Sequence, residues 1–267
     1  MSNKFFIQSQ LGDYVIDIEG GGAAPKVGTK LDAFSKKSSN NTNQQWEFTP
    51  AAGNPGYFFI KSVLGNYVVD IEGGGTAPKP GTLLDAYTQK PNNNGNQQWT
   101  AVPGPAAHSG YCFIKSALGN YVIDIAGGGT APKVGTSLDA FTQKSNNNGN
   151  QLWKLVSVPG NSFNPKIANI QNNPTSPAIV SIGGSGFFPG SQASILFSYI
   201  DVNGVLTQNN GSPAIATVDF GGGLIAAFDI DTLQAEVAGD LTLKVTDSNV
   251  ATITVTLHWD GSEFHFT

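Results

Sequence analysis

The chain has 267 residues, a formal net charge of −5 and only 12% charged residues, and it contains one Cys, 33 Gly and 15 Pro. A single Cys excludes an intrachain disulfide scaffold, and the length is sufficient for a sizeable core. Gly, Asn, Ser and Thr take the place of the missing charges, and these residues are typical of turns between short strands. We therefore expect an all-β protein.

The charged residues also narrow the choice of partners. All 14 basic residues are Lys, so the bidentate Arg contacts that read phosphate and guanine are absent, and no nucleic acid is expected as a partner. No apolar run reaches the roughly 18 residues of a membrane span. No basic segment followed by an apolar one precedes the first expected strand, which favours the cytoplasm or export by a route without a signal peptide.

The charge balance changes along the chain. Residues 1–160 hold 12 Lys and 10 acidic residues, whereas residues 161–267 hold two Lys and nine acidic residues. Such a change indicates two domains of different character.

The first part of the chain contains one segment in three copies. Asp17, Asp70 and Asp124 occupy the same position in the three copies, at spacings of 53 and 54 residues. Alternating apolar and β-branched residues between Gly, Pro and Asn clusters predict four short strands in each copy. In the first copy these strands are Phe5–Ser9, Tyr14–Ile18, Thr29–Phe34 and Gln44–Phe48. Twelve strands with threefold repetition predict a β-trefoil.

Each copy ends in the motif Asn-Gln-x-Trp, which follows a strand of the type Ile-Asp-Ile or Val-Asp-Ile. The Gln and Trp of the three motifs are Gln44/Trp46, Gln97/Trp99 and Gln151/Trp153. With these motifs in register, residues 5–156 resemble the ricin B-chain type β-trefoil lectins. The resemblance implies a non-enzymatic lectin that binds glycans with terminal galactose or N-acetylgalactosamine on glycoproteins or glycolipids, through three equivalent sites.

Each copy also contains the residue types that sugar recognition requires. Carboxylates and amides bind hydroxyl groups, and a flat aromatic face packs on the C–H side of the sugar ring. The resemblance implies that the first Asp and the Asn bind hydroxyls and that the aromatic residue stacks. The Gln should orient the Asn and satisfy backbone groups in the cleft. The expected sugar-binding residues are Asp17, Asp32, Phe34, Asn43, Gln44, Asp70, Asp85, Tyr87, Asn96, Gln97, Asp124, Asp139, Phe141, Asn150 and Gln151.

Structural roles for the same residues stay open at this point. The first Asp can be a surface residue or a cap, the aromatic residue a core residue, and the Asn a turn residue. The second Asp stands where well-known members of the family often carry Gln. Glu19 and Glu72 become Ala126 in the third copy, so the third site is expected to be weaker or differently selective.

Other repeated residues are expected to be structural. The three Trp residues should pack in the core together with Leu31, Leu84 and Leu138. The Asn-rich runs should form tight turns, because Asn and Gly tolerate positive φ. Gly triplets such as Gly73-Gly74-Gly75 should form wide turns beside each pocket.

A different pattern begins after residue 160. Seven short strands with Pro-Gly and Asn-Gly turns predict an immunoglobulin-like β-sandwich. We assign residues 1–157 to the trefoil and residues 162–267 to this sandwich, which would act as a dimerisation module, giving a homodimer, or as a spacer. The predicted strands are Ala178–Ile182, Ser194–Ile200, Ile215–Phe220, Leu224–Ile230, Leu233–Val237, Leu241–Val245 and Ala251–Trp259.

Catalysis is not expected. The three His residues form no recognisable nucleophile or metal pattern, and Cys112 replaces a Phe of the repeat, so it should be a buried hydrophobe. No cofactor and no metal are expected. Two other functions stay open: a glycan-targeted pore-forming toxin, for which Ala251–Leu257 alternates suitably, and a β-trefoil protease inhibitor that acts through one exposed loop.

Overall fold

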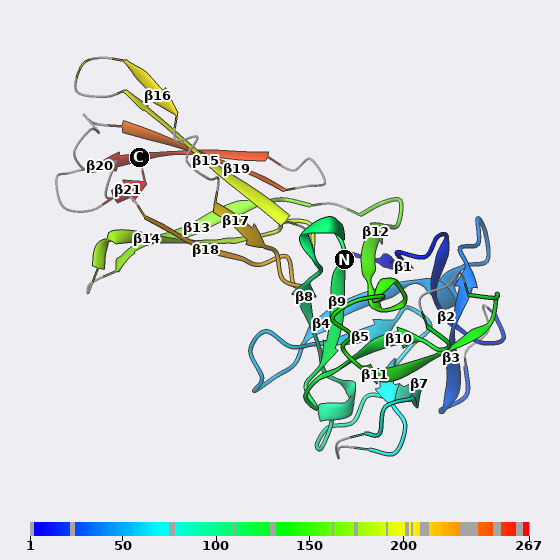
Figure 1. The fold of residues 1–267 in the computed structure, drawn as a ribbon. Helices are drawn as coiled ribbons and strands as arrows, with labels where there is room; N and C mark the ends of the chain where they lie inside the picture. The colour runs from blue at the N-terminus through cyan, green and yellow to red at the C-terminus, as the bar shows by residue number, and fades with distance from the viewer. Residues whose placement is uncertain are drawn as a thin grey trace. The chain divides into compact units, whose positions relative to one another are not determined.

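The chain divides into two compact units, Met1–Ser162 and Phe163–Thr267, in a computed structural model (Figure 1). Among the residues that the structure describes, regular structure consists of β-strands and short 3-10 turns. None of these turns is long and apolar enough to cross a membrane. The described residues are 3–21, 25–74, 78–108, 110–128, 132–161, 163–173, 176–190, 192–200, 203, 205–208, 214–229, 240–247, 252–259 and 264–266.

The first unit contains twelve strands in three groups of four. In each group a strand is followed by a two-stranded hairpin and then by a fourth strand (Figure 1). The strands are β1 (Phe5–Ser9), β2 (Tyr14–Ile18), β3 (Thr29–Ser35), β4 (Trp46–Pro50), β5 (Phe58–Ser62), β6 (Tyr67–Ile71), β7 (Thr82–Thr88), β8 (Trp99–Pro103), β9 (Cys112–Ser116), β10 (Tyr121–Ile125), β11 (Thr136–Thr142) and β12 (Trp153–Ser157).

The pairing of these strands closes the unit into a barrel with a cap. Strands β1, β4, β5, β8, β9 and β12 pair in this order as a closed ring, which β12 completes by pairing with β1. The remaining strands form the hairpins β2–β3, β6–β7 and β10–β11, and their second strands pair with one another in a triangle. This arrangement is a β-trefoil, so the predicted fold of the first unit is confirmed.

The two ends of the trefoil are joined by a side chain. Asn161 accepts a hydrogen bond from the backbone N–H of Lys4 at 2.9 Å and donates to its carbonyl oxygen at 2.6 Å. The Asn161 side chain therefore satisfies both backbone groups of Lys4 and holds the two ends of the trefoil together.

The core is built around the three Trp residues of the repeats. Their side chains are fully buried, and each indole N–H donates to a backbone carbonyl of the preceding hairpin at 2.9 to 3.0 Å. A buried indole needs such a partner for its N–H group. The predicted core positions are confirmed for Trp46, Trp99, Trp153, Leu31, Leu84 and Leu138.

The fourth strand of each repeat begins later than predicted. Thr42–Gln44 forms a 3-10 turn, and β4 begins at Trp46 rather than at Gln44. In a strand, neighbouring side chains point to opposite faces. Asn43 and Gln44, however, are both fully buried and turn toward one carboxylate, which the 3-10 turn permits. The equivalent turns are Gly95–Gln97 and Gly149–Gln151.

The prediction of tight turns in the Asn-rich runs is confirmed. Asn40, Asn93 and Asn147 have φ angles of 49°, 50° and 47°. Asn adopts this left-handed conformation more readily than other non-Gly residues. Each turn leads the chain from the hairpin into the 3-10 turn that carries the Asn and Gln of the motif.

The second unit contains two antiparallel sheets. Strands β13, β14 and β18 form one sheet, and β16, β15, β19, β20 and β21 form the other in this order, with β17 beside β15. Buried residues of both sheets, among them Ile182, Leu224, Ile195 and Leu243, form one hydrophobic cluster. The strands are β13 (Lys166–Asn173), β14 (Ser176–Ser185), β15 (Gln192–Ile200), β16 (Leu206–Gln208), β17 (Ala214–Thr217), β18 (Leu224–Asp229), β19 (Asp240–Asp247), β20 (Thr252–Trp259) and β21 (Phe264–Phe266).

The strands predicted for the second unit overlap β14, β15, β17, β18, β19 and β20. The strand predicted over Ile215–Phe220 ends at Thr217, because Asp219 turns the chain by accepting hydrogen bonds from the N–H groups of Gly221 and Gly223, at 2.8 Å each. The segment Leu233–Val237 lies outside the described residues. The immunoglobulin-like assignment stays a prediction.

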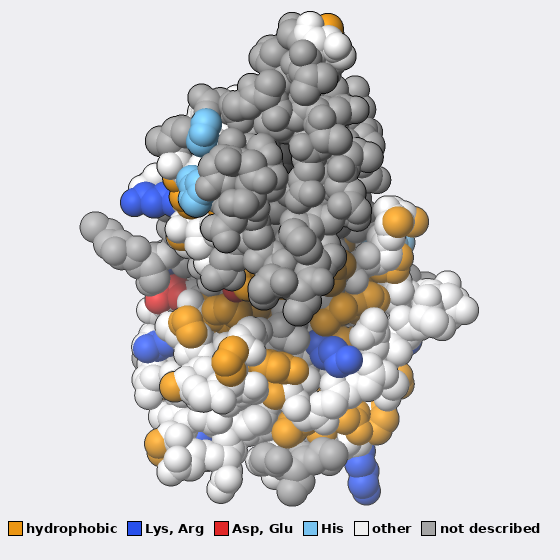
Figure 2. Space-filling model, turned by 90° about the vertical axis from the view of Figure 1, so that its left-hand side faces the viewer, with side chains coloured by type: hydrophobic (Ala, Val, Ile, Leu, Met, Phe, Trp, Pro, Cys, Tyr) orange, Lys and Arg blue, Asp and Glu red, His pale blue; other side chains and the backbone are white. Residues whose placement is uncertain are grey.

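The surface of the first unit carries few charges. Figure 2 shows one of its faces, where uncharged atoms predominate and Lys side chains are scattered singly. This agrees with a composition in which only 12% of residues are charged.

Candidate functional site

In each repeat of the trefoil, one buried carboxylate is the centre of a polar cluster. Asp17, on β2, is only 2% exposed. The side-chain amide of Asn43 donates to both of its oxygens at 2.8 Å, and that of Gln44 donates to Oδ2 at 2.8 Å. Hydrogen bonds to an ionised carboxylate are the strong ones, so they offset much of the penalty for burying it.

Backbone groups hold the two amides in place. Asn43 also donates to the carbonyl of Ile18 at 2.8 Å, and Gln44 donates to that of Ser35 at 3.1 Å. The Gln44 side-chain oxygen accepts the N–H of Lys37 at 2.9 Å. Gln44 satisfies backbone groups as expected, but its amide donates to Asp17 and no hydrogen bond links it to Asn43 among the described contacts.

A Lys that sequence reasoning missed completes the cluster. The ammonium of Lys37 lies 3.2 Å from Oδ2 of Asp17 and 3.3 Å from Oδ1 of Asn43. It also lies 4.9 Å from the centre of the Phe34 ring, within the range of a cation–π interaction. Lys37, Lys90 and Lys144 recur at spacings of 53 and 54 residues, which is the signal that could have identified them.

The other two repeats reproduce this geometry. The Lys-to-Asp distances are 3.0 Å for Lys90 and Asp70, and 3.1 Å for Lys144 and Asp124. The corresponding Gln donates to the Asp at 2.7 and 2.8 Å. The Lys nitrogen lies 5.0 Å from the ring of Tyr87 and 5.2 Å from that of Phe141.

Burial has the largest effect on the pKa of the central carboxylates Asp17, Asp70 and Asp124. It raises the pKa of Asp17, Asp70 and Asp124, while the hydrogen bonds from the neighbouring Gln, Lys and Asn and the charge of the Lys lower it. These carboxylates are therefore neither surface residues nor helix or turn caps, which were the structural alternatives.

The second Asp of each repeat faces the first across the hairpin. Asp32 on β3 is paired in register with Asp17, as Asp85 is with Asp70 and Asp139 with Asp124. The exposed fractions of these second Asp residues are 8%, 6% and 7%. In each of them Oδ1 is buried and has no hydrogen-bond partner within the described part of the chain.

The second Asp of each repeat has a pKa far above its ordinary value. Burial, and after it the charge of the first Asp, raises the pKa of Asp32, Asp85 and Asp139 to about 7, while the charge of the neighbouring Lys lowers it. Glu19 also raises the pKa of Asp32, and Glu72 that of Asp85. Near neutral pH the second Asp of each repeat is therefore partly protonated.

The aromatic residues that were predicted to stack lie at the rim rather than in the core. Tyr87 is 37% exposed, and Phe34 and Phe141 are half-buried. A partly exposed ring that lies next to a satisfied carboxylate offers an apolar face beside polar groups.

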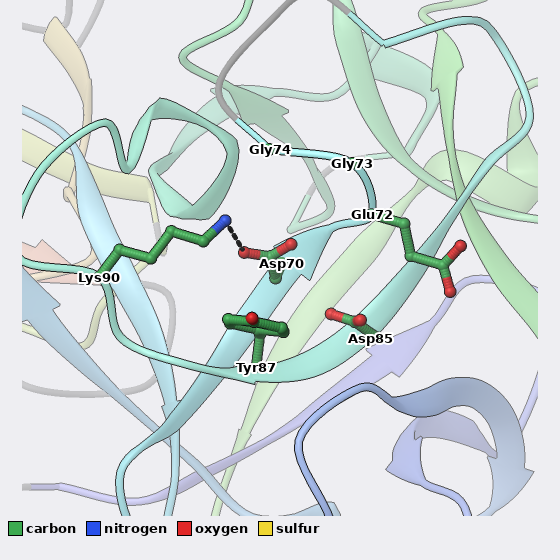
Figure 3. Close-up of a pocket in the computed structure, with 7 residues that line it drawn as sticks. All are labelled: Asp70, Glu72, Gly73, Gly74, Asp85, Tyr87 and Lys90. Carbon is green, nitrogen blue, oxygen red and sulfur yellow. Dashed lines mark hydrogen bonds and ion pairs between the residues drawn. The ribbon is translucent and has the colours of Figure 1, made fainter.

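These groups surround a cavity in the second repeat. The cavity has a volume of about 290 Å³, close to the lower end of the range for small-molecule sites. Figure 3 shows the Tyr87 ring on one side of Asp70, with Lys90 to one side and Asp85 and Glu72 to the other. The remaining wall is backbone, formed by Gly73 and Gly74 at φ angles of 92° and 93°.

Two observations concern residues outside the clusters. Cys112 is buried, and burial raises the pKa of its thiol to about 12, so it behaves as the predicted small hydrophobe. Across the described residues, no group of three or more His, Cys, Asp or Glu side chains is placed to hold a metal ion.

Comparison with known proteins gives one family and several similar structures. The family model described as ricin-type beta-trefoil lectin domain-like matches residues 2–87, 42–138 and 95–176, which together span more than half of the chain. No curated protein sequence matches the chain.

Three similar structures illustrate the range of proteins found. The designed threefold-symmetric protein ThreeFoil is 19% identical, with a TM-score of 0.48 over 58% of this chain and 99% of that one. The C-terminal half of an earthworm R-type lectin, solved with N-acetylgalactosamine, is 25% identical, with a TM-score of 0.43 over 58% and 99%. The ricin B-like lectin of Macrolepiota procera, solved with lactose, is 20% identical, with a TM-score of 0.43 over 57% and 93%.

Proposed function

Since the chain belongs to the ricin-type beta-trefoil lectin domain-like family, we propose that it binds carbohydrate without catalysis, through one site in each of its three repeats. The observation that carries this proposal is the recurrence of one arrangement. In every repeat a hydrogen-bonded Asp, an Asn, a Gln and a Lys lie beside a partly exposed aromatic ring.

The donors and acceptors of the second site fit sugar hydroxyls. A carboxylate has about four lone-pair positions, and Gln97 and Lys90 occupy two of them on Oδ1 of Asp70. The ammonium of Lys90 has three N–H donors and uses two, toward Asp70 and Asn96. Asn96 also hydrogen-bonds Asp70, so about one acceptor position on Asp70 and one donor on Lys90 remain for a ligand that stacks on Tyr87.

We propose that galactose and N-acetylgalactosamine are among the sugars that the three sites bind, because the family resemblance implies them. A galactoside has a continuous C–H face that can pack on an aromatic ring while its hydroxyls reach the carboxylate and the Lys. The positions are the same in all three repeats, so the three sites are proposed to act together.

Several weak sites are effective on a surface dense in glycans. A single shallow site is expected to bind with a dissociation constant of about 1 mM, or about −4 kcal/mol. Rigidly linked sites can increase the overall avidity by a factor of roughly 10² to 10⁴ when they engage the same surface. We therefore propose agglutination or adhesion to glycan-bearing surfaces as the functional outcome.

The experiment is affinity chromatography of the full chain on immobilised lactose. We expect retention and elution by free galactose. A triple variant with Phe34→Ala, Tyr87→Ala and Phe141→Ala should pass through the column while its circular dichroism spectrum stays that of the wild type. Passage of the wild-type protein through lactose, galactose and N-acetylgalactosamine columns would contradict the proposed function.

For the second unit we propose the immunoglobulin-like assignment and a role as a dimerisation module or spacer. The two antiparallel sheets with a shared hydrophobic cluster support the first part. Sedimentation of the full chain distinguishes the roles, because a dimerisation module gives a dimer at micromolar concentration and a spacer gives a monomer.

A further inference from the structure

The pocket of the second repeat contains more negative charge than a neutral sugar requires. Its lining includes the carboxylates of Asp70, Glu72 and Asp85, and one ammonium, that of Lys90. Lys90 forms its ion pair with Asp70 at 3.0 Å. Figure 3 shows Asp85 and Glu72 on the side of the pocket away from Lys90. Glu72 and the partly protonated Asp85 therefore have no cationic partner in this lining.

Asp85, which lines this pocket, has one oxygen without a hydrogen-bond partner. This Oδ1 is buried and has no partner among the described residues, and the whole residue is only 6% exposed. A buried polar atom without a partner typically costs about 1–3 kcal/mol. A donor supplied by a ligand would remove this penalty, and a cationic donor would also offset the negative charge.

The third repeat differs from the first two at one of these carboxylates. The charged groups facing the second Asp are Asp17, Glu19 and Lys37 in the first repeat and Asp70, Glu72 and Lys90 in the second. In the third repeat they are only Asp124 and Lys144, because Ala126 stands where Glu19 and Glu72 stand. Lys30 of β3 is also paired in register with Asp85.

We infer that the first two sites prefer a hexose with a free, protonated amino group, which lies between Asp32 and Glu19 or between Asp85 and Glu72. The third site, with Ala126, favours neutral sugars. This inference rests on the proposed function, since it specifies the sugar that the same three sites take. N-acetylation removes the charge of the amine, so acetylated hexosamines lose the advantage, and anionic sugars are disfavoured.

A sugar ammonium fits this pocket better than a metal ion does. A divalent cation next to Asp70 would lie close to the ammonium of Lys90, which is 3.0 Å from that carboxylate, and the two would repel. An amino group on a sugar ring can lie at the Asp85 and Glu72 side while the ring covers Tyr87. The amine and Lys90 then occupy opposite sides of the pocket.

The experiment is calorimetric titration of the full chain at pH 7 with galactose, galactosamine and N-acetylgalactosamine, together with glucose, glucosamine and N-acetylglucosamine. In at least one of the two series we expect the free amino sugar to bind roughly threefold to tenfold more tightly than the neutral sugar, an effect of one partly exposed charge pair. Two of the three sites should bind the free amino sugar more tightly than the remaining site does.

Three variants test the assignment of the charge. The double variant Glu19→Gln, Glu72→Gln should reduce the ratio of amino-sugar to neutral-sugar affinity toward that of the third site. Ala126→Glu should raise this ratio at the third site, so that all three sites become similar. Glu47→Gln removes a carboxylate from β4, outside the three sites, and should leave the ratio unchanged.

The outcomes separate this inference from the proposed function. Binding of neutral sugars with equal or weaker binding of both free amino sugars would overturn the inference and leave the proposed function intact. A preference for amino sugars that persists in the double variant would also overturn the inference. Absence of binding by all six sugars would contradict the proposed function itself, and the inference with it.

Discussion

Asp17 and Asp32 lie directly opposite each other on β2 and β3, yet only one of them is hydrogen-bonded by its surroundings. Asp17 accepts hydrogen bonds from Asn43, Gln44 and Lys37, whereas Oδ1 of Asp32 has no partner among the described residues. The protein therefore satisfies one carboxylate with hydrogen bonds and leaves one oxygen of the other without a partner, and burial raises the pKa of both.

The first prediction concerns stability and pH. The pKa of Asp32, Asp85 and Asp139 is about 7 in the folded protein against an ordinary value of 3.8, so the folded state favours their neutral form. Their contribution to stability is complete below about pH 4 and is lost as the pH rises to about 7. The groups facing Asp32 are Asp17, Glu19 and Lys37.

Thermal unfolding of the trefoil transition at pH 5 and pH 8 tests this prediction. The wild-type protein should melt at a higher temperature at pH 5, and the triple variant Asp32→Asn, Asp85→Asn, Asp139→Asn should show a much smaller difference. An equal pH dependence in both proteins would mean that these carboxyl groups do not cause it.

The second prediction distinguishes a residue of the core from a residue at the rim of the pocket. Trp99 is fully buried and donates to the carbonyl of Val69 at 3.0 Å, so Trp99→Ala should cost about 3–5 kcal/mol of unfolding free energy. Tyr87 is 37% exposed, so Tyr87→Ala should change stability by less than about 1 kcal/mol and remove binding at the second site. Denaturant unfolding and sugar titration of both variants check this prediction. A larger loss of stability in Tyr87→Ala than in Trp99→Ala would mean that Tyr87 is the core residue.

The third prediction concerns the central carboxylates. In a triple variant with Asp17→Ala, Asp70→Ala and Asp124→Ala, sugar binding should be lost. The protein should still fold with reduced stability, because in the second repeat Asn96 and Gln97 keep the carbonyls of Ile71 and Thr88 as partners. Circular dichroism and retention on a lactose column decide the matter. Folded protein that is still retained would remove these Asp residues from the site.

The fourth prediction concerns Lys37, Lys90 and Lys144, which were not predicted from the sequence to be part of the sites. In the triple variant Lys37→Met, Lys90→Met, Lys144→Met, the apolar stem is kept and the ammonium is removed. Sugar affinity should fall about tenfold per site, the typical effect of losing one hydrogen bond from a charged group. Lys61→Met and Lys115→Met, on β5 and β9, are the controls. Equal affinities in both sets of variants would assign the three Lys residues a structural role alone.

The fold of the first unit was predictable because its signals are local and repeated. The strand Tyr14–Ile18 is rich in β-branched and aromatic residues, and the recurrence of Trp46 at fixed spacings indicated a threefold architecture. The start of β4 was not predictable in this way. The turn at Asn43 and Gln44 depends on a carboxylate more than 25 residues earlier in the chain, which no local pattern encodes.

The site was predictable in its residue types but not in its contacts. Asp17, Asn43 and Gln44 lie together as expected, whereas the contact of Lys37 depends on the path of the chain after β3. In the second unit, β13 (Lys166–Asn173) was missed because its Asn and Lys residues obscure the alternation. Pairing with β14 overrides this weak local preference.

If the three repeats form three functioning sugar sites, as we propose, the stoichiometry of sugar binding reveals their number. Calorimetric titration of the full chain with methyl galactoside at pH 7, at a protein concentration near the dissociation constant, gives the number of sites. We predict a number of sites that approaches three per chain. A value of one, or no detectable heat at millimolar galactoside, would contradict it.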